Sequence, residues 1–282
     1  MKKTLLFLIL VLTASGAAAL SFGDFFTDID QRGEAALIQF SGPVNPTAGT
    51  FSTGITPGEV RELNSLAEEQ GADAIIYEIN SGGGAVVASK EVKRIINSTQ
   101  IPSVCRIRDV GASGAYLYSL GCDSIVADSA SITGSIGVTS SYLEFSDLME
   151  EIGVSYVNIT AGKRKEIGSQ FEEPTEQEKQ ILEGKASMIG DEFLQEVSEA
   201  RNLTDSQEEE VGTGEIFLGS EAKELGLVDE LGGRRTAVEE AEDLTGKDLK
   251  VSKVERTPEF SLFDLFVPGL ELGSEGLLQA SL

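Results

Sequence analysis

Two glycine-rich turns carry the residue types best suited to chemistry. The first reads Asn80-Ser81-Gly82-Gly83-Gly84, and the second runs from Asp109 to Tyr116 with Ser113 between small residues. Backbone N–H groups at the start of a helix favour negative charge, so the first turn suits a phosphate or the oxyanion of acyl transfer. It lacks the glycine spacings of nucleotide-binding loops, which weakens the phosphate interpretation. Taken alone, a glycine triplet is more often a tight strand–helix turn.

The second turn places Ser113 where a strand is expected to pass into a helix. Small neighbours would let a substrate carbonyl approach the hydroxyl, and the following helix would add its positive end. This follows the logic of a nucleophile elbow without its usual spacing. A single serine at such a corner is more often a helix N-cap.

The chain contains no histidine. That excludes a Ser-His-Asp triad, a Cys-His dyad and any metal site that uses histidine. A nucleophilic serine would then need lysine, a carboxylate or a carboxylate-bound metal as its activating partner. Lysine is the leading choice, because burial can favour its neutral form. Lys163 and Lys165 lie in a basic cluster at residues 161–169, which could equally be a solvated loop.

Acidic residues dominate the charge, with 47 Asp and Glu against 22 Lys and Arg and a net charge of −25. Phosphate binding needs a basic face, so nucleic acid is not expected as a partner. The acidic excess indicates a strongly solvated surface. Neither a cofactor nor a metal ion is predicted.

The two cysteines, Cys105 and Cys122, both lie in or beside apolar runs. They could pair in an oxidising compartment. Buried free thiols are the favoured interpretation, because cysteine is often a core residue.

The first twenty residues combine two lysines, a dense leucine run and a small-residue Ala-Ala-Ala segment. This three-part pattern predicts a secretory signal peptide or a retained N-terminal membrane anchor over residues 1–23. Both alternatives place the rest of the chain on the extracytoplasmic side of a membrane, anchored there or secreted.

The body alternates strand and helix patterns over short loops, which predicts an α/β fold with a mainly parallel sheet and flanking helices. One domain is predicted over residues 33–256, followed by a loosely held tail at 257–282. Strands are expected at 35–40, 74–79, 104–107, 124–127, 155–159, 215–218 and 249–254, with a glycine-punctuated run at 132–138. Helices are expected at 57–70, 86–96, 115–120, 145–152, 174–201, 220–225 and 235–244.

Five blocks, in order, make this sequence resemble the signal peptide peptidase A family of membrane-bound Ser-Lys proteases, which have a crotonase-like, Clp-protease-like core. Residues 80–84 resemble the family's N-S-P-G-G turn, and residues 109–116 resemble its D-V-A-A-S-G-G-Y block. Residues 133–138, 162–169 and 224–232 are similar to its T-G-S-I/L-G-V, G-x-x-K-D-x-x-S and closing blocks. The resemblance covers about residues 33 to 245.

The resemblance implies a role for each matched residue. Ser113 corresponds to the nucleophile, Lys165 rather than Lys163 to the general base, and Ser135 to a hydroxyl that orients the lysine. The backbone N–H groups of Gly83 and Gly114 correspond to the oxyanion hole. A carboxylate facing the lysine would favour its charged form, so Glu166 is expected to point away from Lys165.

Three residues depart from the family pattern. Gly82 replaces its proline, Gly111 replaces an alanine before the nucleophile, and Ala115 replaces a glycine after it. None of the three changes removes a reacting group, but together they affect the shape of the oxyanion hole.

By this resemblance the chain is expected to be a membrane-associated serine endopeptidase that degrades cleaved signal peptides and other membrane-derived peptides. A single-copy chain is expected to form a homo-oligomeric ring. Three alternatives remain open: an NfeD-like, stomatin-associated Ser-Lys protease, a non-proteolytic crotonase-like protein that binds acyl thioesters, and an inactive scaffold.

Overall fold

The structure is a computed structural model that describes residues 32–48 and 54–255. The predicted leader at 1–23 and the predicted tail at 257–282 lie outside these residues. From Gly33 onward, the described residues belong to one compact unit. Within the described ranges, every helix is too short or too polar to cross a membrane.

A single eight-stranded sheet organises this unit. Its strands are β1 (Gly33–Ser41), β2 (Ala74–Ser81), β3 (Ser103–Ala112), β4 (Ser124–Ala127), β5 (Ile132–Gly134), β6 (Ile216–Leu218), β7 (Glu230–Leu231) and β8 (Leu249–Lys253).

The strand order is β6-β5-β3-β2-β1-β8, and every pair is parallel except β5 with β6. Strand β3 has two neighbours on one side: its first half pairs with β4 and its last three residues pair with β5. Strand β4 in turn pairs with β7. The mainly parallel sheet predicted from the sequence is therefore confirmed.

Helices follow most strands, as expected for parallel connections. They are α2 (Pro57–Glu69), α3 (Val86–Asn97), α4 (Gly114–Ser119), α5 (Ser146–Glu151), α6 (Glu176–Arg201), α7 (Asp205–Val211), α8 (Gly219–Glu224) and α9 (Arg234–Thr245). Two of the longer helices begin at threonine caps. Thr56 Oγ1 accepts a hydrogen bond from Glu59 N at 3.2 Å, and Thr175 with Glu178 forms a reciprocal capping box at the start of α6.

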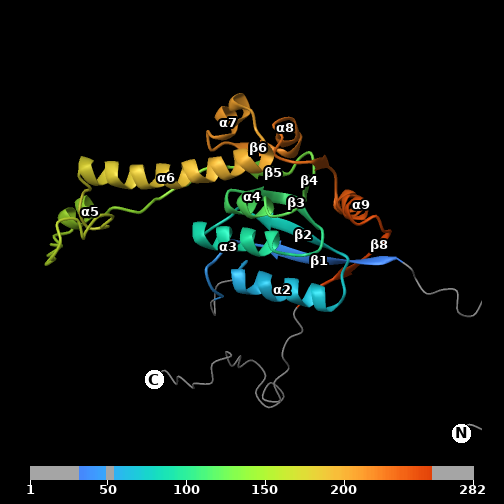
Figure 1. The fold of residues 1–282 in the computed structure, drawn as a ribbon. Helices are drawn as coiled ribbons and strands as arrows, with labels where there is room; N and C mark the ends of the chain where they lie inside the picture. Colours follow the sequence, from blue (N-terminus) through green and yellow to red (C-terminus); the bar gives the residue numbers. More distant parts are fainter. Residues whose placement is uncertain (1–31, 49–53, 256–282) are drawn as a thin grey trace, which may run out of the picture. The chain divides into compact units, whose positions relative to one another are not determined.

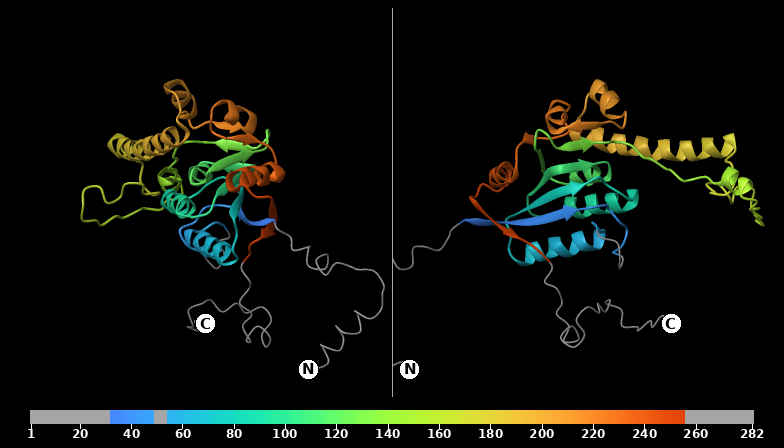
Figure 2. Two further views of the ribbon diagram at one scale, coloured as in Figure 1. Left: turned by 45° about the vertical axis from the view of Figure 1, so that its right-hand side comes forward. Right: turned by 180° about the vertical axis from the view of Figure 1, so that it is seen from behind.

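The sheet separates two apolar layers because successive side chains along a strand point to opposite faces. In β2, Ile75, Tyr77 and Ile79 face a large core shared with α2, α3 and α4. Ala74 and Ile76 face a smaller core closed by α9. Figure 1 shows α2, α3 and α4 grouped together and α9 set apart from them, and Figure 2 shows the same arrangement from two other directions.

The α9 face also contains a buried ion cluster centred on Glu78 of β2. Its carboxylate accepts hydrogen bonds from Arg234 Nε and Nη2 (3.0 and 2.9 Å), from Arg106 Nη1 (2.9 Å) and from Gln39 Nε2 (2.8 Å). Burial alone would raise the pKa of Glu78, but the hydrogen bonds from Arg234 and Gln39 and the two arginine charges lower it to about 2. The cluster fastens the first residue of α9 to three neighbouring strands.

Residues 139–175 form a segment that we call the arm. It contains α5, and not one of its residues is buried. Figures 1 and 2 show the arm beside the amino-terminal end of α6, which extends beyond the sheet, whereas the carboxy-terminal half of α6 lies near α4. The buried side chains of α6, Phe193 and Val197, both belong to that second half.

Three features of this fold differ from the sequence-based expectations. Residues 155–159, predicted as a strand, form none, and Ile159 in that run is 94% exposed. The apolar run alone indicated a strand, but no neighbouring strand is available on the arm to pair with it. Helix α7 and the two-residue strand β7 were not predicted.

Candidate active site

Ser113 lies at the sharp corner where β3 passes into α4. Its backbone has φ 54° and ψ −126°, a conformation that costs a non-glycine residue about 1–3 kcal/mol. Two backbone hydrogen bonds hold it there: Ser113 N donates to Gly134 O at 2.8 Å, and Leu117 N donates to Ser113 O at 2.9 Å. The half-buried serine therefore sits on a strained strand-to-helix turn, as a nucleophile elbow requires.

The first glycine turn packs backbone-to-backbone against the Ser113 turn. A Cβ atom on Gly83 would lie 2.5 Å from Gly114 N, and Gly83 also has a positive φ of 88°. A Cβ on Gly84 would lie 2.3 Å from Val44 O. Only glycine fits these positions without moving the backbone, so the two N–H groups predicted for the oxyanion hole come from adjoining turns.

Hydrogen bonds on both sides brace the glycine turn. Val44 N donates to Gly83 O at 3.0 Å, and Ala85 N donates to Val44 O at 2.9 Å. Val110 N donates to Asn80 Oδ1 at 3.2 Å, which ties the turn to the strand that ends at Ser113. These contacts join residues far apart in the chain, so no local sequence pattern indicates them.

Ser135 lies beside Ser113 because of the register between β3 and β5. Ala112 pairs with Gly134, and each serine follows directly after its paired residue. Ser135 also has a positive φ of 51°, and its N–H donates to Glu215 O at 2.7 Å. The structure thus brings together four of the five predicted site residues, namely Ser113, Ser135, Gly83 and Gly114.

Lys165, the fifth, is not brought to this site within one chain. It is exposed on the arm, in a turn where its N–H donates to Gly162 O at 3.1 Å. It does not line the pocket beside Ser113. Neighbouring Lys163 is exposed as well. Glu166 accepts a hydrogen bond from the Tyr156 hydroxyl at 3.4 Å.

A narrow, mainly apolar pocket of about 20 Å³ opens beside Ser113. Its apolar lining comes from three helices and a loop, with the side chains of Val86, Leu117, Val138, Ile189 and Phe193. Two of these residues, Ile189 and Phe193, belong to α6, so the second half of this helix forms one wall of the pocket. The pocket is therefore narrow, with a largely apolar wall beside the Ser113 turn.

Lys90 of α3 also lines this pocket, which makes it a second lysine to consider as a base. Its Nζ lies 2.6 Å from Glu192 Oε1 and 3.3 Å from Glu196 Oε1, both on α6. With two carboxylates in contact, Lys90 serves as a cation that links α3 to α6. It is therefore poorly suited to accept a proton from Ser113.

The closing block at residues 224–232 packs against α4, the helix that follows Ser113. The buried Tyr116 hydroxyl donates to Leu227 O at 2.8 Å. Asp229 binds Arg201 at the end of α6 through two hydrogen bonds of 2.6 and 3.0 Å, and it also accepts from Ile125 N at 2.8 Å. This block thereby connects α4, α6 and β4.

Cys105 and Cys122 form a disulfide, with Cα atoms 5.7 Å apart, so the expectation of free buried thiols was wrong. Cys105 lies in β3, and Cys122 follows α4. The bridge therefore closes a loop that contains Ser113 and fastens both ends of the strand–turn–helix unit. Sequence spacing could not reveal this pairing, because it depends on how α4 folds back along β3.

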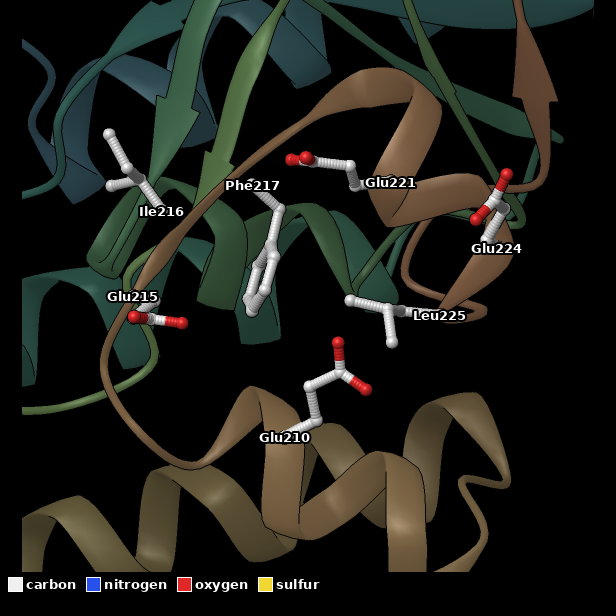
Figure 3. Close-up of a pocket in the computed structure, with 7 residues that line it drawn as sticks. All are labelled: Glu210, Glu215, Ile216, Phe217, Glu221, Glu224 and Leu225. Carbon is white, nitrogen blue, oxygen red and sulfur yellow. The ribbon is translucent and has the colours of Figure 1, made fainter.

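An open acidic pocket of about 550 Å³ lies next to β6. Figure 3 shows the side chains that line it: Glu210, Glu215, Ile216, Phe217, Glu221, Glu224 and Leu225. Glu215 connects this pocket to the Ser135 turn through its backbone carbonyl. Glu221 already accepts a hydrogen bond from Leu218 N at 2.7 Å. No cluster of three or more possible metal ligands occurs among the described residues.

Sequence comparison finds relatives of this chain among proteins described as proteases. The chain is 35% identical to a putative protease of Methanocaldococcus jannaschii over 184 residues, which cover 64% of this chain and 59% of that protein. It is 32% identical to a putative signal peptide peptidase of Enterococcus faecium, covering 63% of this chain and 53% of the relative. The chain thus spans between half and two thirds of the length of these two relatives.

The fold is similar to that of a solved membrane-bound stomatin-specific protease, 1510-N, a lysine-to-alanine mutant in complex with a substrate peptide. The TM-score is 0.55 with 13% sequence identity, over 84% of this chain and 98% of that one. At this identity the similarity shows a shared fold alone. The family model for peptidase family S49 matches residues 95–248, more than half of the chain. This match covers the Ser113 turn, Ser135, Lys165 and the closing block, and it establishes that the chain belongs to peptidase family S49.

Proposed function

We propose that this protein is a serine endopeptidase in which Ser113 is the nucleophile and Lys165 is the general base. The observation that carries the proposal is the Ser113 corner: a strained serine, two adjoining glycine turns and a second serine meet at one edge of the sheet. Each part has a chemical use. The N–H groups of Gly83 and Gly114 would stabilise the oxyanion, and Ser135 would orient the base.

The general base comes, in this proposal, from a second copy of the chain. Within one chain the arm is unburied and carries large exposed apolar side chains, among them Leu143 (68%), Val157 (78%) and Ile159 (94%). Exposed apolar surface of this extent indicates a protein–protein contact. A neighbouring copy in a homo-oligomeric ring would cover the arm and place its Lys165 at the Ser113 turn.

The chemistry then proceeds in two steps. Neutral Lys165 accepts the Ser113 hydroxyl proton while Ser113 Oγ attacks the scissile carbonyl, and the amine product leaves with a proton returned from the lysine. Water next attacks the acyl-enzyme while Lys165 takes its proton, and the lysine then returns that proton to Ser113 Oγ as the second product leaves as a carboxylic acid, which ionises in water.

The proposed substrates are membrane-derived peptides, including cleaved signal peptides. Their apolar side chains match the apolar lining of the pocket beside Ser113. The proposed location is the extracytoplasmic side of a membrane, anchored or secreted through residues 1–23. The Cys105–Cys122 bridge supports this location, because disulfides persist in oxidising compartments.

Active-site labelling combined with hydrolysis of a casein or apolar peptide substrate tests this function. A fluorophosphonate probe should modify Ser113 in the intact protein and should not label the Ser113→Ala variant. Ser113→Ala and Lys165→Ala should each lose at least about 10³-fold in kcat. Lys163→Ala is the matched control, since it removes an exposed lysine from the same loop, and it should stay active.

Two results would redirect the assignment. Full peptide cleavage by Lys165→Ala would remove this lysine from the mechanism and return attention to Lys90. Acyl-thioester turnover without peptide cleavage would favour the crotonase-like alternative, in which the same N–H groups would hold a thioester carbonyl.

A further inference from the structure

The Gly83 N–H, one of the two proposed oxyanion donors, already has an acceptor. It donates to Ser81 Oγ at 3.1 Å, in a buried hydrogen bond between residues two apart. Ser81 is the last residue of β2 and is only 2% exposed. Serine commonly binds the backbone in this local way. The Ser81 hydroxyl therefore fixes the direction of the Gly83 peptide in the empty site.

A second donor lies beside the same hydroxyl. The Tyr118 hydroxyl of α4 is buried and has no hydrogen-bond partner of normal geometry among the described residues. The Tyr118 ring packs edge-on against Phe40 of β1, with ring centroids 6.0 Å apart, and Phe40 pairs with Ile79, two residues before Ser81. Burial raises the pKa of Tyr118, and an interaction with the Ser81 side chain opposes this rise. A buried unpaired hydroxyl is rare, because it loses water without gaining a protein partner.

The Ser81 hydroxyl oxygen thus has two candidate donors, the Gly83 N–H and the Tyr118 hydroxyl. In the proposed reaction, only the Gly83 N–H is taken up by the oxyanion. A serine oxygen has two lone pairs, and one of them is occupied by Gly83. When the tetrahedral intermediate forms, its oxyanion competes for the Gly83 N–H. The hydrogen bond that Ser81 then loses can be replaced by one from Tyr118, so no buried polar group is left unpaired in the transition state.

We propose that Ser81 is a positioning residue for the oxyanion hole, holding the Gly83 N–H in the empty site and receiving the Tyr118 hydroxyl when the oxyanion takes that N–H. The inference rests on the proposed function, because it assumes that Gly83 donates to an oxyanion. Ser81 itself touches neither substrate nor nucleophile. Its effect should therefore appear in the transition state and not in substrate binding.

Steady-state kinetics on the intact, assembled protein test this role. Ser81→Ala should lower kcat roughly tenfold, less than the loss of an oxyanion donor itself, and should leave KM within about twofold. A peptidyl aldehyde, which adds to Ser113 as a tetrahedral adduct, should bind more weakly by about the same factor as kcat/KM falls. The corresponding product peptide, which has no oxyanion, should bind equally well to both proteins.

Tyr118→Phe provides a second, milder variant that removes one hydroxyl without a change of shape. It should lower kcat about threefold, and it should have no further effect in the Ser81→Ala background, because the two hydroxyls act as one unit. Ser119→Ala and Tyr77→Phe are matched controls. Each removes a buried hydroxyl that is bonded elsewhere, to Tyr116 O and to Asn64 Oδ1 respectively, and each should leave kcat unchanged.

The outcomes separate the two proposals. If the wild-type protein neither cleaves peptides nor reacts with the fluorophosphonate probe, the proposed function fails and this inference fails with it. If the wild type is active and Ser81→Ala keeps its full kcat, the positioning role alone is overturned. Equal weakening of aldehyde and product peptide, or additive losses in the double variant, would also overturn it.

Discussion

The two residues of the proposed dyad, Ser113 and Lys165, belong to regions that differ in how firmly the rest of the chain holds them. Ser113 is held by backbone hydrogen bonds, close glycine contacts and a disulfide, so its position follows from the sheet. Lys165 lies on the arm, where no residue is buried. A catalytic group needs accurate placement, and only the first region supplies it within one chain.

This difference indicates a division of labour between core and arm. In the proposed function, the core presents a nucleophile and oxyanion donors that are aligned before any substrate arrives. The arm would present the base on a surface that a second copy of the chain covers. A site completed in this way would be inactive in the isolated chain and active in the assembly, which would limit peptide cleavage to the sheltered interior of the proposed ring.

Mixing two inactive variants gives the largest expected effect. Ser113→Ala lacks only the nucleophile, and Lys165→Ala lacks only the base, so neither should cleave peptides alone. If each site joins Ser113 of one copy to Lys165 of its neighbour, an equal mixture of freely exchanging chains should recover about a quarter of wild-type activity. The measurement is peptide hydrolysis after co-expression or subunit exchange. No recovery in mixed oligomers would place both groups in one chain and contradict the proposed division.

Substitutions in the glycine turn at residues 80–84 test whether its close contact with the Ser113 turn is needed for catalysis. Gly83→Ala would place a Cβ 2.5 Å from Gly114 N, so the backbone must move and one oxyanion donor is lost. We expect kcat to fall about 10²–10³-fold. Gly82→Ala is the matched control, because a Cβ there meets nothing within 4 Å. Equal kinetics for the two variants would show that the close approach of the turns is unimportant.

Acid titration tests how firmly the strand beneath the turn is anchored. Glu78 precedes the glycine turn on β2, and its pKa falls from an ordinary 4.5 to about 2 in the folded protein. A lowered carboxyl pKa stabilises the fold above the unfolded-state value, and this stability is lost as the pH falls from about 4.5 to about 2. The loss should amount to about 3 kcal/mol.

Urea unfolding at several pH values measures this effect. Wild type should lose about 3 kcal/mol more than Glu78→Gln does between pH 5 and pH 2. Glu230→Gln serves as the control, since the carboxylate of Glu230 forms an exposed pair with Lys223. The same pH dependence in wild type and Glu78→Gln would show that Glu78 is not the group responsible.

The smallest expected effect is on stability, and it is tested by comparing an isoleucine of the arm with an isoleucine of the sheet. Ile159→Ala should change the free energy of unfolding of the separated chain by less than about 0.5 kcal/mol, because Ile159 is 94% exposed. Ile76→Ala, at a fully buried position, should cost about 2–5 kcal/mol. Ile159→Ala should nevertheless weaken assembly, measured by analytical ultracentrifugation. A large loss of stability in Ile159→Ala would mean that the arm packs within its own chain.

Much of the fold could be predicted from sequence because its elements have local causes. The apolar runs of β1, β2 and β4 face apolar layers on both sides, so they are nearly continuous in sequence. Thr56-Pro57 and Thr175 start helices through their own side chains. The resemblance to a known family implied that Ser113, Gly83 and Ser135 share a site, and the structure shows why they lie together: each lies at the end of a strand, and these ends meet.

The missed features depend on contacts that no local pattern contains. The Cys105–Cys122 pairing requires α4 to fold back along β3, and the separation of Lys165 from Ser113 requires knowledge of where the arm lies. Helix α7 is an instructive exception. Thr204 and Gln207 form a capping box there, so the sequence did hold a usable pattern at this position.

The backbone strain at Ser113 has an evolutionary consequence. Glycine adopts a positive φ without the steric cost that serine bears, so Ser113→Gly should make the fold more stable while destroying catalysis. Selection for stability and selection for activity therefore oppose each other at this one position. A duplicated gene released from the need to cleave peptides would gain stability by losing its nucleophile, so inactive descendants are easy for this fold to produce.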